Sequence, residues 1–122
     1  MITLLSLSRL LLMTIAIVFA TVPSGFAFDL KKVDSSSRNG NVDSDFEFTV
    51  NKAEANTLGS TEMKATLLVF CTQALGPLGP VAAKFVGEHL DQIKQTATEN
   101  GAYIKMTIRN GTGLHIWEVY PL

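Results

Sequence analysis

The sequence predicts an α+β domain in which a small antiparallel sheet, of about four strands in ββαββ order, carries one long amphipathic helix on one face. Three observations support this fold class. Residues 80–100 place apolar side chains at helical spacing, residues 102–109 alternate apolar and polar side chains, and an Asn-Gly pair follows at Asn110 and Gly111. The apolar face of the helix needs a cover, which the hairpin provides.

Residues 1–27 have the layout of a secretory signal peptide. Arg9 is their only charged residue, an apolar run occupies residues 10–20, and a small residue stands at Ala27. We expect cleavage after Ala27, with cleavage after Ala20 as the alternative. The protein is therefore expected to be secreted or periplasmic.

The next segment, residues 28–45, is rich in Asp, Ser and Asn and contains few residues that would be buried. We expect it to be a flexible polar arm. Residues 46–122 then form a single α+β domain, which a chain of 122 residues with 47% hydrophobic residues is long enough to build. This domain begins with a short strand at residues 46–50, where apolar and polar side chains alternate.

Residues 61–75 fit two structures. As a helix, they begin at Ser60 or Thr61, place apolar residues on one face and stop at Gly76. As a strand, residues 65–72 are a short apolar run rich in β-branched and aromatic residues. That content favours the strand. The helix is the alternative, and it would make a helical hairpin against the C-terminal β-hairpin.

The long helix is expected to begin at Pro80, whose missing N–H is not needed in the first helical turn. It is expected to end at Asn100 and Gly101, a pair typical of a left-handed helix stop. One face of this helix carries Phe85, Val86, Leu90, Ile93 and Ala97, and the opposite face is polar.

The C-terminal hairpin allows two registers around its Asn-Gly turn. A four-residue loop is favoured over a two-residue turn, because it sets Lys105 opposite Glu118. In both registers the core face of the hairpin carries Ile104, Met106, Ile108, His115, Trp117 and Val119. Leu114 and Ile116 then lie on the outer face with Tyr103, and we predict that these three residues form a contact surface.

The chain contains no phosphate-binding loop, zinc-protease motif, Cys-x-x-Cys pair or nucleophile elbow. We therefore expect no enzymatic activity and no cofactor. There is no basic cluster of the kind that binds nucleic acid. The lone Cys71 lies in an apolar run and is expected to be buried. Asn110 begins an N-glycosylation sequon, which matters only if the source is eukaryotic.

His89 and His115 are the two candidate metal ligands. His89 lies in the apolar stripe of the predicted helix, and His115 is expected on the core face of its strand, so the two rings should meet in one interface. A neutral imidazole pair could bind Zn²⁺ or Cu²⁺, but two ligands do not complete a site. A packing role for both histidines is favoured.

Residues 98–120 resemble the helix end, Gly-Ala step and hairpin of small enterobacterial periplasmic stress and biofilm-associated proteins. The resemblance covers only this end of the chain and does not extend to residues 65–78, so it identifies no family. It implies a non-enzymatic envelope protein.

These observations favour an exported, non-enzymatic interaction module. Its expected partner is a protein or an envelope component, and that protein could be a second copy of the chain. The first alternative is a membrane-active protein that uses the charge-free residues 65–83 at a membrane surface. The second alternative is a metal-binding protein based on the two histidines.

Overall fold

The computed structural model describes residues 28–122, so the predicted signal peptide lies outside the described residues. Two β-hairpins form a four-stranded antiparallel sheet in the order β1-β2-β3-β4, which confirms the predicted α+β class. The strands are β1 (Asp29–Arg38), β2 (Asn41–Val50), β3 (Ala102–Arg109) and β4 (Gly113–Pro121). Between β2 and β3 lie α2 (Lys52–Thr57), α3 (Thr61–Leu75), the 3-10 turn η1 (Gly76–Leu78), α4 (Gly79–Gly87) and α5 (Leu90–Thr96).

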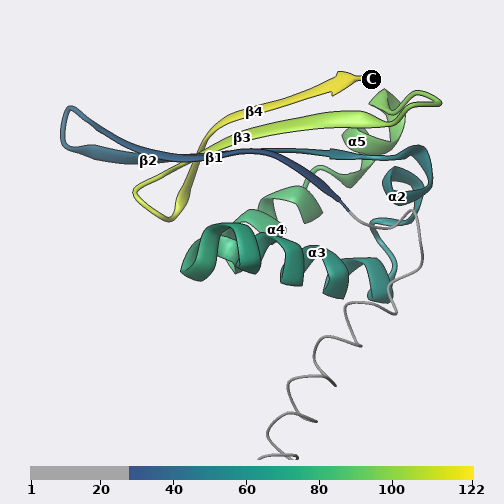
Figure 1. Ribbon diagram of the computed structural model, residues 1–122, viewed down its shortest axis with the longest axis horizontal. Helices are drawn as coiled ribbons and strands as arrows, with labels where there is room; N and C mark the ends of the chain where they lie inside the picture. Colours follow the sequence, from purple (N-terminus) through teal and green to yellow (C-terminus); the bar gives the residue numbers. More distant parts are fainter. Residues whose placement is uncertain (1–27) are drawn as a thin grey trace, which may run out of the picture.

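The helices all lie on one side of the sheet and leave its other face open (Figure 1). The core fills the space between the sheet and the helices. From the sheet it receives Phe46, Phe48 and Val50 of β2 and Ala102, Ile104, Met106 and Ile108 of β3. From the helices it receives Met63, Leu67, Cys71, Ala82, Phe85, Val86 and Ile93. The alternation that predicted a strand at residues 102–109 is therefore the alternation between core and open face.

Residues 28–45 belong to an ordered hairpin, which corrects the expectation of a flexible arm. Residues 29–38 pair with β2, and the turn between the strands is Asn39-Gly40. Its φ angles of 50° and 80° are those that an Asn-Gly pair favours in a two-residue hairpin turn. The strand lacked a sequence signal because it lies at the edge of the sheet, where its side chains are exposed on both faces. Residues 28–45 are therefore part of the domain.

Four phenylalanines tie the first hairpin to α3. The ring of Phe28 lies 6.0 Å from that of Phe48 and 5.3 Å from that of Phe70. Phe46 stacks on Phe48 at 5.0 Å, and Phe70 lies 5.3 Å from Phe48. Such pairs add to the free energy of burial through their ring electrostatics.

Residues 61–75 form helix α3, so the favoured strand interpretation is wrong and its helical alternative is confirmed. Ser60 is the N-cap, and its hydroxyl accepts a hydrogen bond from the Met63 N–H at 3.2 Å. Met63, Leu67 and Cys71 are buried at a spacing of one helical turn. The N-cap at Ser60 and the burial of one residue per helical turn favour the helix more strongly than the β-branched residues of the segment favour a strand.

The chain reverses direction after α3, so α3 and α4 form a helical hairpin. Gly76 caps α3 with a φ of 63°, a conformation that glycine adopts without strain. The two helices approach closely at Gly79, where a Cβ atom would lie 2.4 Å from the Thr72 Cα atom. A side chain at position 79 would therefore separate the helices.

The expected single helix over residues 80–100 is in fact two helices, α4 and α5. The break occurs at Glu88 and His89, after Gly87. It lets α4 pack on α3 while α5 packs on α2 and on strands β3 and β4. The helical pattern also ends early, because Thr98 and Gly101 form a tight turn closed by two backbone hydrogen bonds of 3.0 and 2.9 Å.

Helix α2 begins with a capping box whose acidic member is buried. The Asn51 side chain accepts a hydrogen bond from the Glu54 N–H at 2.7 Å, and the Glu54 Oε1 atom accepts one from the Asn51 N–H at 2.7 Å. Glu54 is only 1% exposed, and its Oε2 atom has no hydrogen-bond partner among the described residues. Burial raises the pKa of this carboxyl, and the backbone hydrogen bond from Asn51 opposes that rise.

The raised pKa of Glu54 predicts a pH dependence of stability. The folded state retains the proton to a higher pH than the unfolded state, so this stabilisation is complete below the ordinary glutamate pKa. It is lost as the pH rises through the folded-state pKa. Glu54→Gln keeps the cap acceptor and removes the ionisation, so urea unfolding of this variant should lose less stability than wild type between acidic and neutral pH. Glu54→Ala, which removes the acceptor, should cost about 1 kcal/mol. Identical pH profiles for wild type and Glu54→Gln would contradict the assignment.

Candidate functional site

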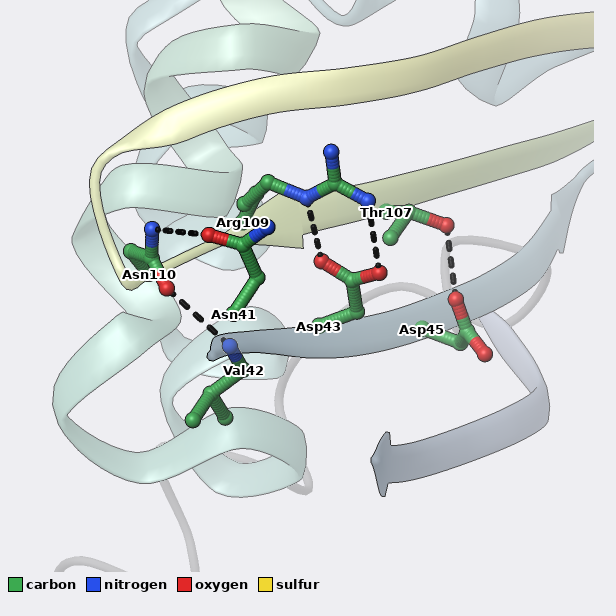
Figure 2. Close-up of polar contacts among 7 residues, drawn as sticks. All are labelled: Asn41, Val42, Asp43, Asp45, Thr107, Arg109 and Asn110. Atoms are coloured by element: carbon green, nitrogen blue, oxygen red, sulfur yellow. Dashed lines mark hydrogen bonds and ion pairs between the residues drawn. The ribbon is translucent and has the colours of Figure 1, made fainter. Parts of the chain in front are cut away.

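The open face of the sheet carries a row of acidic residues on β2, each held by a donor from β3 (Figure 2). Arg109 donates two hydrogen bonds to Asp43, from Nε to Oδ1 at 2.8 Å and from Nη2 to Oδ2 at 3.0 Å. The Thr107 hydroxyl donates to the Asp45 Oδ1 atom at 2.6 Å. Asp43 pairs with Arg109 and Asp45 with Thr107 in the strand register, so these contacts are cross-strand pairs.

The same row continues at Glu47. The Tyr103 hydroxyl donates to the Glu47 Oε1 atom at 2.5 Å. This hydrogen bond, which ionisation of the phenol would destroy, raises the pKa of Tyr103 to about 12. From β1, the Lys32 ammonium lies 3.9 Å from carboxylate oxygens of both Asp45 and Glu47. The carboxylates of β2 are therefore already engaged by groups of the protein itself.

One β-bulge in the second hairpin decides which residues of β4 reach the open face. The favoured register holds for most of the hairpin, with Lys105 opposite Glu118. Near the turn the register shifts by one residue, so that Ile108 lies opposite Leu114 instead of His115. In a bulge, two residues of one strand oppose one residue of the other, and the face of the extra residue changes.

The bulge corrects two of the predictions for β4. Leu114 packs against the core instead of lying on the outer face. His115 lies on the open face, where it lines a hollow together with Thr107 and Arg109. Of the three predicted contact residues, Tyr103 and Ile116 lie on the open face, as expected, and the side chain of Ile116 is 37% exposed.

The hollow on the open face has a volume of about 260 Å³ and takes residues from all four strands. These are Lys32 and Ser36 of β1, Asp43 and Asp45 of β2, Lys105, Thr107 and Arg109 of β3, and His115 and Ile116 of β4. Sequence analysis missed Asp43, Asp45, Lys105 and Arg109. The alternation in residues 43–48 could have revealed the acidic row. Ser44, Phe46 and Phe48 are buried, and acidic residues occupy the positions between them.

The two histidines do not form a pair, so the expectation that their rings meet in one interface is wrong. His89 lies on the helix side of the sheet, where its ring stacks on Trp117 at 4.1 Å, whereas His115 lies on the open face. The His89 Nδ1–H donates to the Phe85 carbonyl oxygen at 2.7 Å, and the Trp117 indole N–H donates to Gln92 at 2.6 Å. Within residues 28–122, no cluster of three or more His, Cys, Asp or Glu residues could hold a metal ion.

Asn110 holds the turn of the second hairpin against the start of β2. Its Oδ1 atom accepts a hydrogen bond from the Val42 N–H at 3.0 Å, and its Nδ2 group donates to the Asn41 side chain at 3.0 Å (Figure 2). The side-chain nitrogen that glycosylation would modify is thus already used in a hydrogen bond to Asn41. Glycosylation of Asn110 in a eukaryotic source stays a prediction.

Cys71 is fully buried in the core, as predicted. Burial raises the pKa of its thiol to about 12, because the apolar surroundings disfavour the thiolate. The thiol therefore packs in the core as an apolar group.

Comparison of the chain with known protein families, with characterised proteins and with solved structures finds no match to any of them. The functional argument therefore rests on the geometry of the described residues.

Proposed function

We propose that the protein is a small, exported, non-enzymatic binding protein, and that the hollow on the open face of its sheet holds an acidic segment of a partner protein. The observation that carries this proposal is the imbalance of hydrogen-bonding groups in the hollow. Asp43 and Asp45 are engaged by Arg109 and Thr107. Lys105 lies between Glu47 and Glu118 in the strand register but forms no ion pair within 4.0 Å among the described residues.

The groups left to a ligand are donors. The paired guanidinium of Arg109 uses Nε and Nη2 for Asp43, so Nη1 lies outside that pair. Together with the Lys105 ammonium and the Ser36 hydroxyl, it would complement a carboxylate. Ile116 adds exposed apolar surface at the same hollow. An acidic side chain next to an apolar one would therefore match this face.

Export is part of the proposal and is supported by the leader-like composition of residues 1–27. Phe28, which directly follows the predicted cleavage position, is buried in the core. A binding role is further supported by the absence of catalytic motifs from the sequence.

The test compares Lys105→Glu with Lys94→Glu, which makes the same charge change at an exposed position on α5. The tagged full chain is used to capture partners by cross-linking in its source, and each purified candidate is then measured by calorimetry. Lys105→Glu should weaken partner binding about ten-fold or more, and Lys94→Glu should leave it within about two-fold. Added salt should weaken wild-type binding. A partner that binds wild type and Lys105→Glu equally would exclude this hollow as its site.

A further inference from the structure

The middle of the α3–α4 hairpin carries no charged residue, and part of its outer surface is apolar. Leu68 is 42% exposed and Val69 is 38% exposed, and no charged residue occurs between Lys64 and Lys84. The stretch Thr61–Gly87 is long and apolar enough, by length and composition, to cross a membrane. Only 22% of its most apolar 18 residues are buried. Because the chain reverses at Gly76, this stretch is not one straight helix but a hairpin that lies against the sheet.

A groove of about 260 Å³ runs between the two helices on this side of the molecule. It is lined by four leucines, Leu58, Leu67, Leu68 and Leu90, and by Lys64 and Lys84. No carboxylate lines it, and neither lysine has an ion-pair partner among residues 28–122. The surface therefore combines apolar area with unpaired positive charge.

We propose that this face of the α3–α4 hairpin docks on the surface of an anionic lipid bilayer. Leu68 and Val69 would enter the boundary between headgroups and acyl chains, and Lys64 and Lys84 would extend their ammonium groups to lipid phosphates. The charge pattern selects this occupant over a second copy of the chain, because two copies joined through this groove would bring lysines together without carboxylates between them. The helices lie on the side of the sheet away from its open face (Figure 1), and the groove shares no residue with the hollow of the proposed partner site.

Vesicle co-sedimentation tests this surface. Wild type and variants are prepared from the full chain, so any contribution of residues 1–27 is common to all. The vesicles contain phosphatidylcholine alone or with phosphatidylglycerol at a mole fraction of about 0.3. Wild type should bind the anionic vesicles, and binding should weaken as salt is added.

The variants assign the binding to the hairpin. The double variant Lys64→Gln, Lys84→Gln should lower the partition coefficient about thirty-fold, since each lysine near an anionic surface contributes about 1 kcal/mol. Leu68→Gln should lower it roughly five-fold, because part of its apolar surface no longer enters the lipid. Lys94→Gln on α5 and Tyr120→Gln on β4 make similar changes at exposed residues outside both proposed sites, and these variants should bind like wild type. Thermal unfolding confirms that each variant is folded.

Three results would overturn the proposal. The first is equal binding of wild type to neutral and anionic vesicles. The second is equal loss of binding in the hairpin variants and in the control variants at Lys94 and Tyr120. The third is a wild-type dimer that Leu68→Gln converts to a monomer in light scattering, without vesicle binding, because the groove would then join two copies of the chain.

Discussion

Gly101→Ala should destabilise the protein by about 3 kcal/mol or more, through a steric clash combined with an unfavourable backbone conformation. Gly101 has a φ of 104°, and a Cβ atom on it would lie 2.0 Å from the Val50 carbonyl oxygen and 2.9 Å from the Asn51 Cα atom. Both neighbours are backbone atoms at the end of β2, so relief would require the strands to separate. Urea unfolding of the two proteins measures the difference.

Gly87→Ala is the matched control for this prediction. No atom lies within 4 Å of the position that its Cβ atom would take, and the residue ends helix α4. The change should be neutral or stabilise the protein by up to about 1 kcal/mol, through helix propensity. If Gly101→Ala unfolds at the same urea concentration as Gly87→Ala, the close approach between Gly101 and β2 is absent in solution.

Phe48→Ala should cost about 3 to 5 kcal/mol, the range observed when a buried phenylalanine is truncated. Phe48 has no exposed surface, and its ring contacts those of Phe28, Phe46 and Phe70. The variant loses the burial of its own ring and leaves a cavity at the junction of β1, β2 and α3. Because a domain of this size is marginally stable, much of the protein should be unfolded at physiological temperature.

Val33→Ala is the control within the same sheet. Val33 pairs with Phe46 and shares its face, but it lies on edge strand β1 and is 42% exposed. Its truncation should cost less than about 1 kcal/mol. A similar loss for Val33→Ala and Phe48→Ala, measured by chemical unfolding, would show that the aromatic cluster does not anchor the first hairpin.

Local sequence signals predicted the second hairpin well, because its strands obey their own periodicity. The alternation in residues 102–109 predicted β3, and the Asn-Gly pair at Asn110 and Gly111 predicted the turn. The charge pairing that favoured a register also placed Lys105 opposite Glu118, as found. The same Asn-Gly signal at Asn39-Gly40 was available for the first hairpin, but the exposed residues of β1 carry no alternation to accompany it.

The candidate site was only partly visible in the sequence. Tyr103 and Ile116 follow from strand alternation alone, and both lie on the open face. The hollow itself depends on β1 and β2, which bring Lys32 and Asp43 beside Lys105 and Arg109 of β3. These residues are far apart in the chain, so their juxtaposition depends on strand pairing that no local pattern predicts.

The sequence by itself determined the α+β class, the burial of Cys71 and the face of every residue in β3, because these depend on composition and on the period of each element. The tertiary structure decided the rest. It made residues 61–75 a helix that buries Met63, Leu67 and Cys71. It also divided the predicted long helix at His89, so that α4 and α5 pack on different partners, and moved His115 to the open face through one bulge. Each of these outcomes depends on contacts between segments distant in the chain, and the free energy of those contacts exceeds the small differences in local propensity that a sequence pattern reports.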